Sequence, residues 1–218
     1  MSTLRRLVVT ADPALLADRT PPAGVPDDAE RLLEDGLLGW RFAADEWAAA
    51  PEPGPGWAVH TLPAAVAEAP VPLVVTDVDS TLIRQEVIEL LAAHAGREAE
   101  VAEVTERAMR GELDFAASLA ERVALLKGLP ESVIDEVRER ITLTEGAPEL
   151  VAAVHEAGGV VALVSGGFTS IIGPRAGALG ITEVHANGLE VDQGRLTGRT
   201  EGRVVDPSAK AAILATIA

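Results

Sequence analysis

Two aspartates separated by one residue, Asp77 and Asp79, are the side chains of this chain best suited to chemistry. They directly follow the apolar run 71–76, which is rich in β-branched residues and predicts a buried strand. Ligands of open α/β sheets bind at the carboxyl ends of strands, and alternate residues of an extended segment share a face. Because neighbouring negative charges repel, we expect a proton on one carboxylate or a cation between them, and Mg²⁺ is a hard cation that suits carboxylates.

Two other interpretations use the same segment. A calcium-binding loop would need Gly at its sixth position and Glu at its twelfth, but this chain has Leu82 and Ile88 there, so that loop is excluded. Asp79-Ser80-Thr81 would also suit a simple helix cap after a strand. The choice between a cap and a metal site depends on the rest of the chain.

The composition limits the classes of partner. The 218-residue chain has a formal net charge of −16, so we expect neither nucleic acid nor an anionic membrane as a partner. It has no Cys, which excludes disulfides and thiolate chemistry. With no long apolar span and no signal-type core after Met1 to Arg6, we expect a cytoplasmic protein. A homodimer is left open.

Residues 1–69 differ in texture from the rest and predict a small amino-terminal region whose role the sequence does not indicate. A strand is expected at 4–10, a short helix at 28–38, and a linker at the Pro-rich segment 51–56. The tryptophans fall here and indicate packing rather than chemistry: Trp40, Trp47 and Trp57.

Residues 70–218 read as a second, α/β domain. Strands are expected at 71–76 and 160–164, then as short pieces at 184–186, 189–191 and 196–198, with a final helix from Pro207. Strand, helix and strand in alternation predict a doubly wound parallel sheet. Between the first two strands the pattern holds only helices, at 86–95, 97–110, 114–127 and 131–140. This cluster, at about 85–145, predicts an inserted helical cap over the carboxyl edge of the sheet.

Two further features point to the same edge. Ser165-Gly166-Gly167 ends the second strand, and small residues before a helix can cradle an anion, although an ordinary turn looks the same. Lys210 lies in the first turns of the last helix, from which it could reach a phosphate, although a lone Lys is usually solvated.

The cap carries a basic and an acidic side chain of interest. Arg122 shares a helix face with Phe115 and Leu119, where a guanidinium either extends to solvent or receives a buried anion. Glu86 begins the cap, nine residues after Asp77. A carboxylate and a guanidinium above a phosphate site would suit a phosphorylated amino acid.

Taken together, these residues resemble the phosphoserine phosphatases of the haloacid dehalogenase-like superfamily, from about Leu73 to the end of the chain. The resemblance implies a Rossmann-like core with a helical cap. The segments that carry it are Asp77-Val78-Asp79-Ser80-Thr81, Glu86, Phe115, Arg122, Ser165-Gly166-Gly167-Phe168, Ala186-Asn187-Gly188-Leu189 and Lys210.

The resemblance implies catalytic roles. Asp77 would be the nucleophile that becomes an aspartyl phosphate and also a Mg²⁺ ligand. Asp79 would protonate the leaving oxygen and then activate water, while its backbone carbonyl contacts the metal. Ser165, Gly166 and Lys210 would hold the phosphate.

It also implies the substrate. Glu86 would bind the ammonium group and Arg122 the carboxylate of O-phospho-L-serine, while Met109 and Phe115 line the cap. The reaction would be the last step of serine biosynthesis. A phosphatase for another small phosphorylated amino acid or metabolite is the alternative enzyme, and a truncated, non-catalytic phosphoserine-binding remnant is the alternative outside enzymes.

One motif of the family does not occur in residues 1–218. This is a Gly-Asp-Gly-x-x-Asp loop, whose first Asp would complete the Mg²⁺ shell, and the sequence ends at Ala218 within the helix of Lys210. From residues 1–218 by themselves we therefore expect weak Mg²⁺ binding, low stability and little activity.

Overall fold

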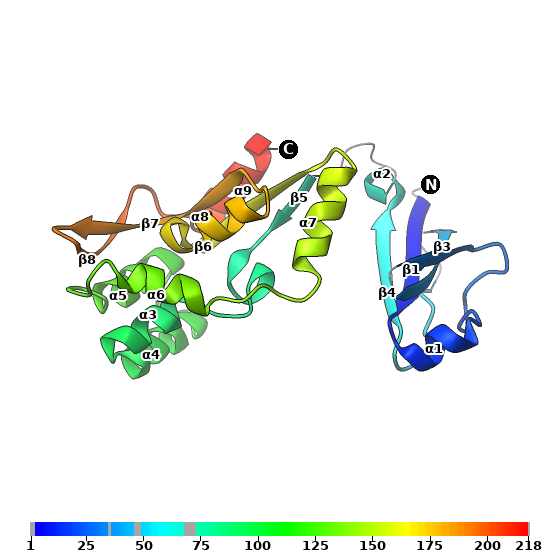
Figure 1. Ribbon diagram of the computed structural model, residues 1–218, viewed down its shortest axis with the longest axis horizontal. Helices are drawn as coiled ribbons and strands as arrows, with labels where there is room; N and C mark the ends of the chain where they lie inside the picture. Colours follow the sequence, from blue (N-terminus) through cyan, green and yellow to red (C-terminus); the bar gives the residue numbers. More distant parts are fainter. Residues whose placement is uncertain (1–2, 35, 46–48, 68–72, 218) are drawn as a thin grey trace. The chain divides into compact units, whose positions relative to one another are not determined.

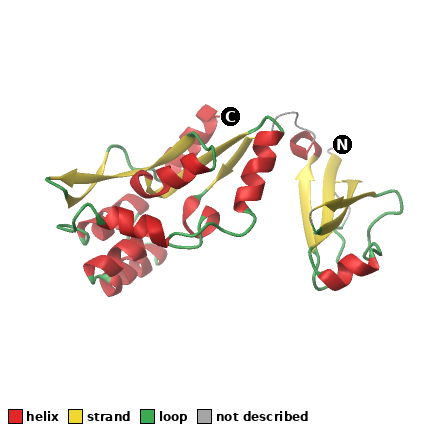
Figure 2. Ribbon diagram, viewed as in Figure 1, coloured by secondary structure: helices red, strands yellow, loops and turns green. Residues whose placement is uncertain are grey.

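The computed structural model describes residues 3–34, 36–45, 49–67 and 73–217 (Figure 1). These residues belong to two compact units, one within 1–70 and the other within 71–218. The first is built mainly of strands and the second of strands and helices (Figure 2). Among the described residues, no helix is long and apolar enough to cross a membrane.

The amino-terminal unit contains an antiparallel sheet with the strand order β2-β3-β1-β4. Its tryptophans pack as expected where they are described, since the rings of Trp40 and Trp57 lie 5.5 Å apart; Trp47 is outside the described residues. The elements of this unit are β1 (Thr3–Thr10), α1 (Pro13–Asp18), β2 (Glu30–Glu34), β3 (Leu37–Asp45), β4 (Ala58–Pro63) and α2 (Ala64–Ala67).

The expected helix at 28–38 is wrong, because this segment forms β2 and the start of β3. Leu33 pairs with Leu38 across the two strands, and Leu38 is fully buried. Gly36 has a φ of +79°, which a hairpin turn accepts and a helix does not. Leucines that are adjacent in the sequence fit the period of a helix as well as that of a strand. Hydrogen bonding between β2 and β3 decides between the two.

The second unit confirms the α/β prediction. Its sheet has the order β5-β6-β7-β8, parallel from β5 to β7 and antiparallel at β8. The short strands expected at 184–186 and 189–191 form the single strand β7, which turns at Gln193 and Gly194, both with positive φ. The elements outside the cap are β5 (Leu73–Thr76), α7 (Ala147–Glu156), β6 (Val160–Phe168), α8 (Thr169–Ala178), β7 (Glu183–Asp192), β8 (Arg195–Glu201) and α9 (Pro207–Ile217). Residues 71–72 of the first expected strand lie outside the described residues.

A helical cap lies between β5 and α7 in sequence. It consists of α3 (Val87–Ala95), α4 (Glu98–Met109), α5 (Phe115–Ala124) and α6 (Val133–Arg140). Buried side chains of the cap, such as Leu91 and Val123, belong to the same hydrophobic cluster as Leu163 of β6. Burial of this shared apolar surface fixes the cap on the sheet.

The two connections between cap and sheet run side by side and form a neck. The amide of Arg84 donates to the carbonyl of Thr142 at 3.0 Å, and the amide of Thr144 donates to the carbonyl of Leu82 at 2.9 Å. The Gln85 side chain adds hydrogen bonds to both the backbone and the hydroxyl of Thr142. Entry to the cap and exit from it are therefore fixed together.

The β7–β8 hairpin is tied to the cap by backbone hydrogen bonds. The amide of Gly128 donates to the carbonyl of Leu196 at 2.8 Å, and the amide of Leu196 donates to the carbonyl of Leu129 at 2.9 Å. Close approach requires glycine at one position: a Cβ on Gly198, whose φ is +83°, would lie 2.9 Å from the Cβ of Lys127. The hairpin thus packs directly on the end of α5.

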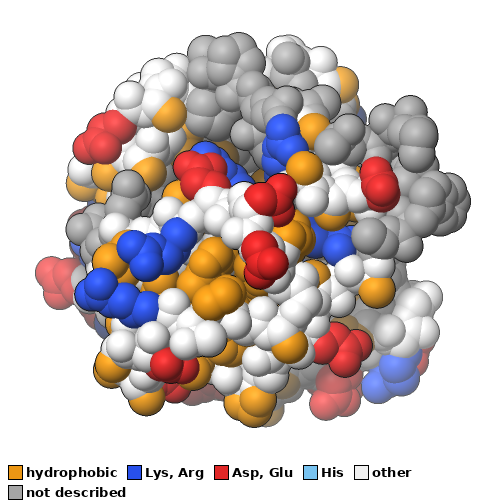
Figure 3. All heavy atoms as spheres, turned by 90° about the vertical axis from the view of Figure 1, so that its right-hand side faces the viewer, with side chains coloured by type: hydrophobic (Ala, Val, Ile, Leu, Met, Phe, Trp, Pro, Cys, Tyr) orange, Lys and Arg blue, Asp and Glu red, His pale blue; other side chains and the backbone are white. Residues whose placement is uncertain are grey.

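The face shown in Figure 3 carries both acidic and basic side chains, with hydrophobic side chains between them. The net charge of −16 is therefore not spread as a uniform acidic surface over this face.

Replacing Gly198 should loosen the contact between hairpin and cap. In Gly198→Ala, the methyl group meets Lys127 and the backbone of Ala124 in addition to the cost of a positive φ. Gly194→Ala is the matched control, because Gly194 has a φ of +71° and a Cβ added there would have no heavy atom within 4 Å. We expect Gly194→Ala to lower the free energy of unfolding by about 1 kcal/mol, and Gly198→Ala by roughly 1–3 kcal/mol more. Denaturant titrations measure both, and equal losses would contradict the packing argument.

Candidate active site

Asp77 lies at the carboxyl end of β5 and is held by two donors. Its Oδ1 accepts a hydrogen bond from the amide of Val78 at 2.8 Å, and its Oδ2 lies 2.6 Å from the Nζ of Lys210. Burial would raise the pKa of Asp77, but the hydrogen bond and charge of Lys210, the Val78 amide and the Ser165 hydroxyl outweigh burial and lower it. Asp77 is therefore a carboxylate at neutral pH and available as a nucleophile.

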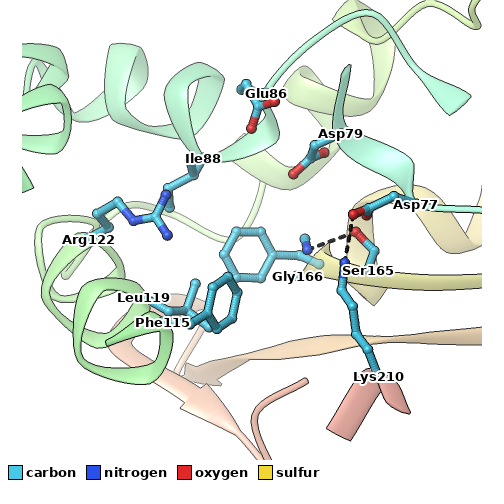
Figure 4. Close-up of a pocket in the computed structure, with 12 residues that line it drawn as sticks. Asp77, Asp79, Glu86, Ile88, Phe115, Leu119, Arg122, Ser165, Gly166 and Lys210 are labelled. Carbon is cyan, nitrogen blue, oxygen red and sulfur yellow. Dashed lines mark hydrogen bonds and ion pairs between the residues drawn. The ribbon is translucent and has the colours of Figure 1, made fainter. Parts of the chain in front are cut away.

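Helix α9 positions Lys210. The Asp206 side chain caps this helix by accepting from the amide of Ala209 at 2.7 Å, and the amide of Lys210 donates to the Asp206 carbonyl at 2.8 Å. Ala209 is buried, which fixes the face of the helix that packs inward. The first turn of α9 thus aims Lys210 at the end of β5 (Figure 4).

Ser165, Gly166 and Gly167 lie within β6, which continues to Phe168 rather than ending at Val164 as expected. The pairing register with β7 shifts between Val164 and Phe168, so this stretch departs from regular ladder geometry. Ser165 is 1% exposed, and its Oγ accepts from the amide of Gly167 at 3.0 Å. The backbone therefore orients the hydroxyl beside Asp77.

The pKa of Asp79 shifts in the opposite direction from that of Asp77. Burial, together with the negative charges of Glu86 and Asp77, raises the pKa of Asp79 to about 7, although the Val87 amide and Arg122 oppose this. Its Oδ1 is buried without a hydrogen-bond partner among the described residues. A carboxyl group that holds its proton near neutral pH can act as a general acid.

The cap contributes Glu86 and Arg122. The Ser80 hydroxyl donates to Glu86 at 2.5 Å, and the Nε of Arg122 donates to the carbonyl of Ser118 at 3.2 Å. Burial lowers the pKa of Arg122, and Glu86 and Asp79 oppose this effect; a guanidinium keeps its charge at neutral pH regardless. In Figure 4, Arg122 lies across the cavity from Asp77, with Glu86 between them along the rim.

Phe115 begins α5, which Asp114 caps by accepting from the amide of Ala117 at 2.7 Å. The Phe115 ring rests on Gly166: a Cβ on that glycine would lie 2.7 Å from the Cζ of the ring. Gly166 therefore lets an aromatic ring of the cap approach the β6 backbone closely.

These residues enclose one cavity of about 190 Å³. All of the predicted site residues line it except Met109, which ends α4 and is 84% exposed. Gly167, which the sequence placed in the possible anion cradle with Ser165 and Gly166, also lines the cavity. Three lining residues had no predicted site role. Ile88 follows Glu86 by two positions and Leu119 follows Phe115 by one helical turn, so their spacing from predicted residues was the available signal; the third is Phe168.

Asp77 and Asp79 are the oxygen donors that could hold a cation in this cavity. Among the described residues, no group of three or more His, Asp or Glu is arranged to hold a metal ion. The Asp77 carboxylate, ionised and lining the cavity, is a hard ligand of the type that Mg²⁺ takes together with several waters. The donor chemistry therefore fits Mg²⁺ with two oxygen ligands from this chain, the carboxylate of Asp77 and the backbone carbonyl of Asp79, which leaves the Asp79 carboxyl free to hold its proton.

Three comparisons bear on this geometry. The phosphoserine phosphatase of Streptomyces coelicolor is 56% identical over 142 residues, which are 65% of this chain and 35% of that protein. A structure described as a phospho-aspartyl intermediate analogue of phosphoserine phosphatase is 44% identical, with a TM-score of 0.62, over 66% of this chain and 69% of that one. A probable phosphoserine phosphatase from Vibrio cholerae, in unliganded form, is 32% identical with a TM-score of 0.71 and covers 98% of this chain and 68% of its own.

The resemblance noted from the sequence is confirmed by these relatives. The chain spans about a third to two thirds of the length of the curated relatives it matches. The family of haloacid dehalogenase-like hydrolases matches residues 74–218, which include every element that lines the cavity. This chain therefore belongs to the haloacid dehalogenase-like hydrolases.

Proposed function

We propose that this protein hydrolyses O-phospho-L-serine to L-serine and phosphate. The observation that carries the proposal is the order of charges along the cavity: Arg122 at one side, Glu86 next, and the Asp77–Lys210 pair at the other. Phosphoserine carries its carboxylate and its ammonium on the same carbon and its phosphate at the other end, so Arg122 can pair with the carboxylate and Glu86 with the ammonium while the phosphate reaches Lys210. The names of the relatives support the same substrate.

The first step is transfer of the phosphoryl group to Asp77. An Asp77 oxygen forms a bond to phosphorus as the bond between phosphorus and the serine oxygen breaks. The proton that Asp79 holds near neutral pH goes to the leaving oxygen. Lys210 and Ser165 stabilise the negative charge on the phosphoryl oxygens. The relative whose structure is described as a phospho-aspartyl intermediate analogue supports a covalent route.

The second step releases phosphate. Asp79, now a carboxylate, takes a proton from a water molecule that attacks phosphorus, and the bond from Asp77 to phosphorus breaks. Phe115 covers the Gly166 backbone and limits the entry of bulk water on that side. The enzyme returns to its starting protonation.

Mg²⁺ would be held by Asp77 and by Asp79 and would supply positive charge to the phosphoryl group. Without that charge, the Asp77 carboxylate and the phosphate would repel each other in a partly buried cavity. Lys210 offsets only part of this repulsion, since its single charge is already paired with Asp77.

Covalent catalysis predicts a specific loss in Asp77→Asn. This variant should form no phosphoenzyme, while Asp79→Asn should slow transfer and hydrolysis by about 10²-fold or more. Asp114→Asn is the matched control, because Asn caps α5 as well as Asp and residue 114 does not line the cavity. Rapid-quench trapping of phosphoprotein with radiolabelled phosphoserine measures the first step. Substantial turnover by Asp77→Asn would overturn the mechanism.

The raised pKa of Asp79 predicts a pH dependence of stability in metal-free buffer. The folded state keeps the proton up to about pH 7, whereas the unfolded state loses it near the ordinary Asp value. The contribution of Asp79 is therefore full at acid pH and is lost as the pH rises through 7. Relative to Asp79→Asn, the wild-type free energy of unfolding should fall by at most about 1.4 kcal/mol per pH unit between about pH 4 and 7. Parallel curves for the two proteins would show that Asp79 is not protonated in the fold.

Arg122 should determine preference for a substrate carboxylate. Arg122→Ala should remove one charge-assisted hydrogen bond to the substrate. The KM for phosphoserine should rise by the factor that corresponds to a loss of roughly 1.5–3 kcal/mol in binding free energy. It should change the KM for phosphoethanolamine, which has no carboxylate, much less. Arg107→Ala is the control, since Arg107 pairs with Glu121 and does not line the cavity. An equal loss on both substrates would assign Arg122 to packing alone.

A further inference from the structure

Asn187 is a buried polar residue to which neither the proposed reaction nor the cavity assigns a role. It is the only Asn in the 218 residues, is 1% exposed, and lies in β7 opposite Phe168 of β6. A primary amide buried this deeply is costly unless both its donor and its acceptor are paired.

Both ends of the Asn187 amide are paired, and each reaches a different strand or segment of the site. Its Nδ2 donates to the carbonyl of Gly166 at 2.8 Å. Its Oδ1 accepts from the amide of Val205 at 2.8 Å. Gly166 lies between Ser165 and Gly167 in the phosphate end of the cavity, and Val205 immediately precedes the Asp206 cap of α9.

We propose that Asn187 is a positioning residue that fixes the spacing between the Ser165–Gly167 segment and the helix that carries Lys210. We call the two hydrogen bonds of the Asn187 side chain the tether. The effect of the tether on catalysis rests on the proposed function, whereas the tether itself does not. Val205 is buried, and its amide is held one residue before the cap that sets the first turn of α9. Through this short path, the side chain of Asn187 determines where Lys210 can meet Asp77.

Two features make Asn187 a suitable fixed point. The β7–β8 hairpin that follows it is tied to the cap through Gly128 and Leu129, so its base cannot shift freely. Loss of the amide would also leave the Gly166 carbonyl and the Val205 amide without their partner inside the protein. Those groups would then move to find water or another partner.

Three variants separate positioning from general stability. Asn187→Asp keeps an acceptor for the Val205 amide but places an oxygen against the Gly166 carbonyl. Asn187→Ala removes both bonds. Leu189→Ala is the matched control, because Leu189 is a buried residue of the same strand that packs in the hydrophobic cluster and makes neither of the two hydrogen bonds of Asn187. All three should lower stability, and circular dichroism identifies the conditions under which each is folded.

The first measurement reads Lys210 directly and needs no turnover. The chain has two lysines, Lys127 and Lys210, so [¹³Cε]lysine gives two NMR signals, which Lys127→Arg assigns. The Lys210 signal in Asp77→Asn defines its position without the ion pair. We expect both Asn187 variants to move the Lys210 signal toward that position, and Leu189→Ala to leave it unchanged. An unmoved Lys210 signal in the folded Asn187 variants would overturn the proposal.

The second measurement is the affinity for inorganic phosphate in the presence of Mg²⁺, by isothermal titration calorimetry. We expect the Asn187 variants to bind phosphate about tenfold more weakly than wild type, and Leu189→Ala to bind it normally. Equal weakening in all three variants would reduce Asn187 to a structural role. A wild-type protein that neither binds phosphate nor hydrolyses phosphoserine would sink the proposed function, while the Lys210 signal would still decide on the tether.

Discussion

The ion pair between Asp77 and Lys210 is the interaction on which the charges of the cavity depend. It joins β5, the first strand of the unit, to α9, its last helix, and so links two segments that are far apart in the sequence. The two charged atoms, Asp77 Oδ2 and Lys210 Nζ, lie 2.6 Å apart. Both side chains are partly exposed, so as an isolated surface pair it would contribute little stability. Its value is electrostatic: it keeps Asp77 ionised, while burial and the negative charges of Glu86 and Asp77 leave a proton on Asp79. The two acids of the motif thus acquire different chemistry from their surroundings.

Glycine at a few positions makes this arrangement sterically possible. Gly166 admits the ring of Phe115, and a Cβ on Gly167 would lie 3.1 Å from an Asp79 oxygen. Both are places where side chains of other segments meet the β6 backbone. The absence of side chains at Gly166 and Gly167 therefore shapes the cavity, together with the polar groups of β6. It also leaves space in the site although the cap packs closely on the sheet.

Much of this unit was predictable from the sequence, for identifiable reasons. Asp77 follows a strand, Lys210 stands in a first helical turn, and Ser165 begins the irregular last part of β6; parallel topology brings such positions together. The segment at 28–38 was mispredicted because its leucines suit two periods, and only pairing with a neighbouring strand decides. Met109 was assigned to the site by resemblance alone. No pattern in the sequence shows whether a side chain at the end of α4 points to the cavity or to solvent, and Met109 is exposed. The role of Asn187 depends on two hydrogen bonds to residues far along the chain, which spacing does not reveal.

The neck and the hairpin together have a mechanical consequence. The cap is attached at 82–84 and 142–144, which lie side by side, and again at 128–131 on the hairpin. Two adjacent attachments alone would define a hinge axis, about which a lid could swing. The third attachment, to the hairpin, lies away from that axis and restrains rotation of the cap about it. Rotation of the cap away from the sheet would therefore bend the β7–β8 hairpin with it or break these backbone hydrogen bonds.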